Sequence, residues 1–211
     1  MAALLHHRQT EPHPQISPTP LPMHRATLVI TLMVVAAINT VSAEEQTDGG
    51  RSRESHIIRL QPSAFAQLPT QIVRPLQEQG CTIPQSFVDP QPHNVVQGEL
   101  RRKGQMDWAV LCSRDGHSSI LVFGNSSPTR ITEISRQSDG IFVQGIGGGK
   151  LGYSRRIGIV GKQFIIEHYR AYGGPEPPRI DHQGIDDAFL EKASVVHYYH
   201  GGRWLELTGA D

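Results

Sequence analysis

Asp181 and His182, followed by Asp186 and Asp187, form the densest group of side chains in this sequence that could carry out chemistry. Carboxylates and an imidazole can bind a divalent cation or act as general acid and base. Their spacing fits no calcium loop, and no second histidine follows four residues after the first. Asp186 and Asp187 fit equally well at the start of a short helix over 185–192, where carboxylates stabilise the helix dipole. The four residues are the candidate site of a secreted hydrolase, but the structural interpretation is favoured.

Other patterns that look catalytic or metal-binding fail on their spacing. The stretch Gly145–Lys150 resembles a phosphate-binding loop, but its glycines stand too close to the lysine, and Leu151 replaces serine or threonine. His168, His197 and His200 could supply a three-histidine zinc site, but His197 and His200 point to opposite faces of one predicted strand. We therefore expect no metal, no cofactor and no catalytic triad, and we favour a protein that is not an enzyme.

The last hairpin offers a candidate recognition surface. Strands over 193–200 and 203–208 flank Gly201-Gly202, which is a strong signal for a two-residue turn. Strand alternation gives this hairpin one apolar face and one half-polar face, and the half-polar face consists of His197, Tyr199, Trp204 and Glu206. Tyrosine and tryptophan often anchor interfaces, so this face is predicted to bind a protein or a sugar. A covering loop over 172–184 would instead make it a second small core, and both interpretations stay open.

Cys81 and Cys112 are predicted to form a disulfide. Two cysteines in an exported protein usually pair, and neither has the surroundings of a catalytic nucleophile. Cys112 shares a strand face with Trp108 and Val110. The bond should therefore hold a preceding helix against that face.

Most of the elements that position these residues are predicted to be strands. Asp107–Phe123 contains two apolar, β-rich runs around Asp115-Gly116, and both faces of these runs are apolar. Such strands are central in a sheet and covered on both sides. A further turn is predicted at Asp139-Gly140, and another at Gly161-Lys162 with a strand over 163–169 after it.

A helical segment is predicted before these strands. It begins near Ser63 as N-cap and stops at Gly80, with apolar residues at helical spacing at Phe65, Leu68, Ile72 and Leu76. The predicted fold class is α+β, with this N-terminal helical segment packed on a mainly antiparallel β-sheet or sandwich built from hairpins.

The N-terminal region has the pattern of a targeting sequence. Residues 1–22 are rich in proline, histidine and polar residues and are predicted to be disordered, and translation could start at Met23. Residues 23–43 have the basic start, apolar centre and small-residue cleavage site of a signal peptide. The apolar run is too short to cross a bilayer comfortably, so we expect no stable membrane span after cleavage. Residues 44–55 are predicted to be a flexible linker, and 56–211 a single domain.

Composition limits the possible partners. Lysine plus arginine and aspartate plus glutamate each number 20, so bulk charge does not favour nucleic acid or an anionic membrane. Two cysteines exclude a zinc finger or a disulfide-dense miniprotein. Arg101-Arg102-Lys103 and Arg155-Arg156 are local basic spots that could touch an anionic envelope polymer, but such turn residues are usually just solvated.

These features favour a periplasmic or secreted, non-catalytic binding module for a protein or an envelope glycan, with enzyme inhibitors as one subclass. The signal peptide together with Gly80–Gln85 and Asp107–Ser113 resembles secreted bacterial proteins in general. That resemblance implies export and no particular activity. The hydrolase built on Asp181, His182, Asp186 and Asp187 is the alternative.

Overall fold

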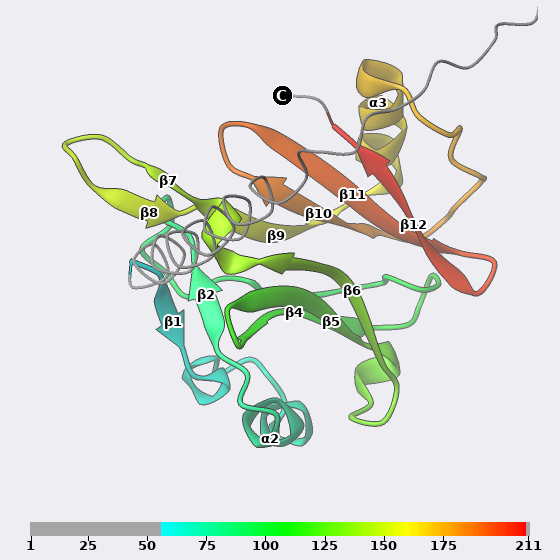
Figure 1. The fold of residues 1–211 in the computed structure, drawn as a ribbon. Coiled ribbons are helices and arrows are strands. Elements are labelled where there is room, and N and C mark those ends of the chain that lie inside the picture. Colours follow the sequence, from blue (N-terminus) through cyan, green and yellow to red (C-terminus); the bar gives the residue numbers. More distant parts are fainter. Residues whose placement is uncertain (1–55, 210–211) are drawn as a thin grey trace, which may run out of the picture. The chain divides into compact units, whose positions relative to one another are not determined.

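The computed structural model describes residues 56–209, so the predicted leader, signal peptide and linker lie outside the described residues. The described chain is mostly β, with twelve strands in four antiparallel sheets (Figure 1). The α-helices within this range are α2 (Thr70–Glu78) and α3 (Lys162–Tyr172), of only nine and eleven residues. The predicted α+β class is therefore wrong, because strands make up most of the regular structure and no helical segment forms a major part of the fold.

Two four-stranded sheets form the body of the domain. The first sheet has the order β3-β4-β5-β6 and the second sheet the order β12-β11-β10-β9. The strands of the first sheet are β3 (Val95–Gly98), β4 (Asp107–Arg114), β5 (His117–Phe123) and β6 (Ile131–Ser138). Those of the second sheet are β9 (Arg155–Val160), β10 (Gly184–Phe189), β11 (Ala193–His200) and β12 (Arg203–Thr208). The two smaller sheets pair β1 (Ile58–Leu60) with β2 (Ile83–Gln85), and β7 (Val143–Gly145) with β8 (Leu151–Tyr153).

The two principal hairpins form as the sequence predicts. Asp115 and Gly116 both have positive φ and join β4 to β5, and Trp108 lies opposite Phe123. Gly201 and Gly202 also have positive φ and join β11 to β12. A turn with two positive φ angles matches the twist of the flanking strands, which explains why these sequences form tight hairpins.

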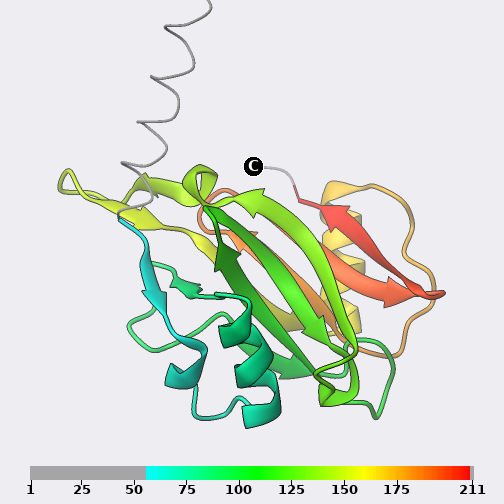
Figure 2. The same ribbon diagram turned by 60° about the horizontal axis from the view of Figure 1, so that its bottom comes forward.

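The two sheets pack face to face, and a helix covers each outer face (Figures 1 and 2). α2 packs Leu76 against the outer face of the first sheet. Between the sheets, Leu111 and Ile120 meet Ile185. On the outer face of the second sheet, α3 buries Ile165. The prediction that β4 and β5 are covered on both sides is confirmed, because α2 lies on one side of them and the second sheet on the other.

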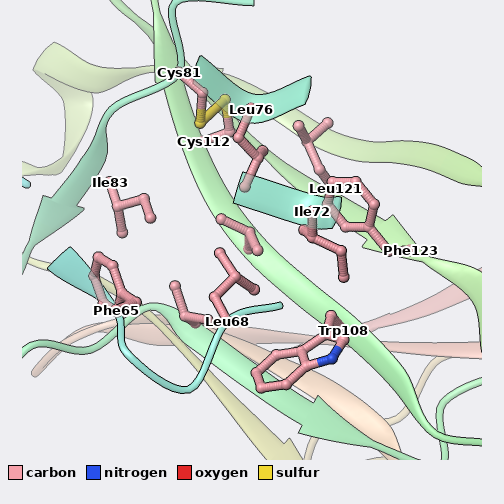
Figure 3. Packing of buried hydrophobic residues seen from close by; sticks show 12 residues of the cluster. Phe65, Leu68, Ile72, Leu76, Cys81, Ile83, Trp108, Cys112, Leu121 and Phe123 are labelled. Atoms are coloured by element: carbon pink, nitrogen blue, oxygen red, sulfur yellow. A yellow bond between two sulfur atoms is a disulfide. The ribbon is translucent and has the colours of Figure 1, made fainter. Parts of the chain in front are cut away.

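The Cys81–Cys112 disulfide is also confirmed, with 5.4 Å between the two Cα atoms. Figure 3 shows the bond beside Leu76 in the cluster that joins α2 to β4.

The helix is shorter than predicted, because Ser63 lies in a separate turn of 3₁₀ helix and α2 begins only after Pro69. Proline at the helix start is compatible with its fixed φ and its missing N–H.

Two predicted elements have the wrong type. Residues 163–169 form part of α3, in which Ile165 and His168 are buried three residues apart, a helical spacing. Residues 185–189 form strand β10, because pairing with β9 on one side and β11 on the other satisfies their backbone groups. Short apolar runs do not distinguish helix from strand by periodicity alone.

The predicted hairpin at Asp139-Gly140 does not form. Asp139 begins a turn of 3₁₀ helix, and β7 pairs with β8 around a loop that contains Gly147, Gly148 and Gly149. The Asp139 carboxylate is buried and accepts hydrogen bonds from Arg59 and Ser113, so this aspartate serves long-range packing and not a hairpin turn.

Candidate functional site

The four residues proposed as a hydrolase site are not brought together. Asp186 and Asp187 are neighbours on β10, so strand alternation sends their side chains to opposite faces of the second sheet. Asp181 is exposed on the connection before β10. His182 is buried, and its Nδ1 lies 2.8 Å from the carbonyl oxygen of Gln183. These four side chains therefore share no centre at which a substrate could react.

Asp187 belongs to a buried ion pair between the two sheets. Arg155 on β9 is 0% exposed, and it donates from Nε to Asp187 Oδ1 at 2.8 Å and from Nη2 to Oδ2 at 2.7 Å. The same guanidinium donates to the backbone oxygens of Ser118 on β5 and Ser135 on β6, at 2.9 and 2.7 Å. Burial alone would raise the pKa of Asp187, but the hydrogen bonds and charge of Arg155 hold that pKa well below its usual value. The carboxylate thus ties the sheets together and is not a free general base.

The β6 strand carries an irregularity next to this ion pair. Its register with β5 shifts between the partners of Ser118 and Ile120, and Ser135 in the shifted part has a φ of +54°. Ser135 Oγ donates to Asp187 Oδ2 at 2.7 Å. A bulge of this kind re-aims a side chain, and here it turns Ser135 toward the second sheet. The sequence gives no glycine signal at this position, so the bulge could not be predicted.

His197 lies on the inner face of β11, close to the same carboxylate. It is 3% exposed, and its Nε2 lies 3.5 Å from Asp187 Oδ2. Its Nδ1 lies 3.8 Å from Glu206 Oε2 on β12, and the two residues are opposite each other in the register of β11 with β12. Nε2 makes no hydrogen bond with the described residues. Buried polar atoms without partners are uncommon, and they are a reason to look for a ligand or water nearby.

The aromatic pair of the predicted recognition face is present and half-buried. Tyr199 and Trp204 meet edge to face, with ring centroids 5.6 Å apart. Trp204 also packs against the apolar cluster between the sheets, so its face of the hairpin looks toward the first sheet. The first sheet therefore provides part of the cover of this face.

A cleft of about 830 Å³ opens where the hairpin, the β6 edge and the chain after α3 meet. The hairpin contributes His197, Tyr198, His200, Arg203, Trp204, Leu205 and Glu206. The opposite walls are Ile134 and Ser135 of β6, together with Pro175, Glu176 and Pro178. The structure thus brings three of the four predicted binding residues, His197, Trp204 and Glu206, to one cleft. Tyr199 borders a separate hollow beside it.

A second polar group, under α3, resembles a catalytic triad only superficially. His168 Nε2 lies 3.3 Å from Ser194 Oγ, near Asp186. Burial lowers the pKa of His168 and raises the pKa of Asp186. The His168 Nδ1 atom is buried without a hydrogen-bond partner among the described residues, whereas a triad places its carboxylate there. A Cβ at Gly209 would lie 2.9 Å from His168 Nε2, so the end of β12 passes close to this histidine.

Comparisons with protein-family models, with curated proteins and with solved structures found no match to this chain. Within residues 56–209, no three or more His, Cys, Asp or Glu side chains are grouped so as to hold a metal ion. The helices in this range are too short or too polar to cross a membrane.

Proposed function

We propose that this domain is a non-catalytic, exported binding module that holds an envelope glycan in the cleft beside Trp204. The observation that carries the proposal is the cleft of about 830 Å³ with a half-buried tryptophan in its wall. Arg203, Glu206 and Glu176 line the same cleft and provide both donors and acceptors. An apolar ring beside polar groups matches a sugar ring, which has one apolar face and several hydroxyl groups.

The size and concavity of the cleft favour a glycan over a flat protein interface. Small-ligand pockets occupy about 300–1,000 Å³, whereas stable protein interfaces bury roughly 1,200–2,000 Å² of surface. The volume here lies in the first range. A short oligosaccharide is therefore the ligand class that we propose.

The side chains around the cleft favour binding without catalysis. Ser135 and Asp187 hydrogen bond to each other and to Arg155, so neither is available as nucleophile or general base. The hydrolase alternative gains no support, because its four side chains face different directions.

A second candidate, capture of an extended protein segment, has one observation in its favour. β12 is an edge strand of the second sheet, so one side of its backbone pairs with no strand of the described residues. Edge strands can accept a strand from a partner, as in some enzyme inhibitors. Binding of an extended peptide that competes with sugars for the cleft would favour this candidate.

Export is proposed on the disulfide and on the sequence of residues 23–43. Disulfides persist mainly in oxidising compartments such as the periplasm or the exterior of the cell. N-terminal sequencing of the protein recovered from the periplasm or medium should begin near Glu44. A membrane-bound product that begins at Met1 or Met23 would show that the segment is an anchor.

Replacement of Trp204 tests the proposed cleft. Trp204→Leu keeps apolar bulk but removes the aromatic ring, and it should weaken binding of N-acetylglucosamine tetrasaccharide at least about fivefold, or ~1 kcal/mol. Trp204→Phe keeps a ring and should recover part of that affinity. Isothermal titration calorimetry gives the affinities, and the melting temperature of each variant shows whether it is folded.

Phe164→Leu is the matched control, because Phe164 is an exposed aromatic residue on α3 that does not line the cleft. This change should leave binding of sugars within about twofold of the parent protein. Equal affinities for the Trp204→Leu variant and the parent would contradict the proposed cleft.

A further inference from the structure

A second hollow, of about 280 Å³, lies beside Tyr199 and is lined mainly by arginine. Three guanidinium groups border it, and they come from two turns far apart in the sequence: Arg101, Arg102 and Arg130. The remaining lining residues are Gln105, Gly124 and Tyr199. We call this hollow the arginine pocket.

The buried carboxylate of Asp107 builds both turns. It accepts hydrogen bonds from the backbone N–H of Arg101 at 3.0 Å and from Gln105 Nε2 at 2.6 Å. It also accepts from the backbone N–H of Asn125 at 2.6 Å, which fixes the loop that follows β5. That loop closes through a hydrogen bond of 2.9 Å from the N–H of Gly124 to the carbonyl oxygen of Arg130. One aspartate thus sets the positions from which the arginines reach the pocket.

Arg101 is held in place without a counter-charge. Its Nη2 donates to Thr132 Oγ1 at 2.8 Å, and its guanidinium lies 5.6 Å from the centroid of the Tyr199 ring. Its Nε is buried and has no hydrogen-bond partner among the described residues. A Cβ at Gly124 would lie 2.7 Å from Arg101 Nη1, so a larger residue at this place would displace the guanidinium.

None of the three guanidinium groups forms an ion pair with the described residues. The buried carboxylate of Asp107 accepts from the two backbone N–H groups and the one amide named above, and not from these guanidinium groups. Other arginines on the first sheet have carboxylate partners, for example Arg114 with Glu133 at 3.4 Å. Three arginines around one hollow provide the chemistry that recognises an oxyanion.

We propose that the arginine pocket binds a carboxylate, sulfate or phosphate group of the glycan that occupies the neighbouring cleft. Tyr199 lines the pocket, and its ring contacts Trp204 in the wall of the cleft. The two sites are therefore joined by a continuous pair of aromatic rings. This inference rests on the proposed function and narrows it to an acidic polysaccharide.

The first test compares charged and neutral tetrasaccharides by isothermal titration calorimetry. The neutral probe is N-acetylglucosamine tetrasaccharide, the carboxylate probe is an alginate tetrasaccharide, and a sulfated tetrasaccharide separates the two anion types. Arg102→Ala/Arg130→Ala should weaken binding of at least one charged probe about tenfold or more and leave the neutral probe within about twofold. Both arginines are exposed, so the double variant should fold.

Two further variants separate a built pocket from diffuse attraction. Lys103→Ala removes one charge from the same turn but not from the lining, and it should change binding of the charged probes less than about twofold. Gly124→Ala keeps every charge but displaces the Arg101 guanidinium, and it should weaken binding of the charged probes several-fold. If Lys103→Ala has as large an effect as Arg102→Ala/Arg130→Ala, or if Gly124→Ala has none, the pocket is overturned.

The two proposals fail in different ways. Loss of binding in Trp204→Leu with no effect of the arginine variants would overturn the arginine pocket and support the cleft. Loss of charged-probe binding in the arginine variants alone, with Trp204→Leu unchanged, would support the pocket and overturn the cleft as the sugar site.

Discussion

Asp187→Ala is expected to destabilise the domain by about 3–5 kcal/mol, because it leaves the guanidinium of Arg155 buried and unpaired. Arg155 is 0% exposed and donates to two strands of the first sheet as well as to Asp187. The remaining backbone acceptors cannot neutralise its charge. Urea unfolding at neutral pH measures the loss of free energy of unfolding. The comparison holds when this free energy depends equally steeply on urea concentration in variant and parent.

Asp186→Ala is the matched control for this change. Asp186 is the next residue on the same strand but faces α3, and burial raises its pKa, so its ionised form gains little from folding. Its removal should therefore change the free energy of unfolding by less than about 1 kcal/mol. Similar losses in Asp186→Ala and Asp187→Ala would contradict the assigned role of the ion pair.

The same ion pair predicts how stability depends on pH. The folded pKa of Asp187 lies below its unfolded value of about 3.9, so its contribution is complete above that value. The contribution is lost as the pH falls from about 4 toward the folded pKa. The free energy of unfolding of the parent protein should fall more steeply than that of Asp187→Ala over this acid range. If the free energy of unfolding falls equally steeply with pH in both proteins, the ionised carboxylate of Asp187 does not stabilise the fold.

Removal of the disulfide in Cys81→Ala/Cys112→Ala should lower the free energy of unfolding by roughly 3–4 kcal/mol. The bond closes a loop of 31 residues that includes β2 and β3, and its loss gives the unfolded chain more freedom. Both cysteines are also fully buried against α2, so the variant loses some packing in addition. Thermal unfolding of the variant and of the parent measures the difference.

Chemical reduction of the parent protein provides the control for this variant, because it breaks the bond without changing side-chain volume. Reduced parent and double variant should show similar melting temperatures, both clearly below that of the oxidised parent. Two reactive thiols in the native protein without reductant would show that the bond is absent in solution.

Local signals in the sequence predicted the features that depend on neighbouring residues. Asp115-Gly116 and Gly201-Gly202 determine two hairpins and their registers. The reason is that few other residue pairs adopt a positive φ at both positions of a two-residue turn. The predicted export and the cysteine count together predicted the disulfide. His197, Trp204 and Glu206 could be grouped from the hairpin register alone, and the structure places them in one cleft.

Features that depend on long-range contacts could not be predicted. Arg155 and Arg156 have the sequence pattern of a solvated basic pair, yet Arg155 is buried. Its burial depends on Asp187, which lies 32 residues later on the adjacent strand. The predicted strand over 163–169 was wrong because Ile165 packs against β11 and β12, which come later in the chain. The arginine pocket joins a turn at 101–105 to one at 124–130 through Asp107, and no local pattern connects them.

The indole signal of Trp204 provides the most direct test that the cleft beside it is the binding site. The chain has two tryptophans, and the other, Trp108, is buried against α2 on the far face of the first sheet. In ¹H–¹⁵N NMR spectra each tryptophan gives one indole N–H resonance, and these two can be assigned from the Trp204→Phe variant.

Titration with the alginate tetrasaccharide should shift the Trp204 indole resonance in a saturable manner and leave the Trp108 resonance in place. Binding detected by calorimetry without any shift of the Trp204 resonance would contradict the cleft as the site of recognition.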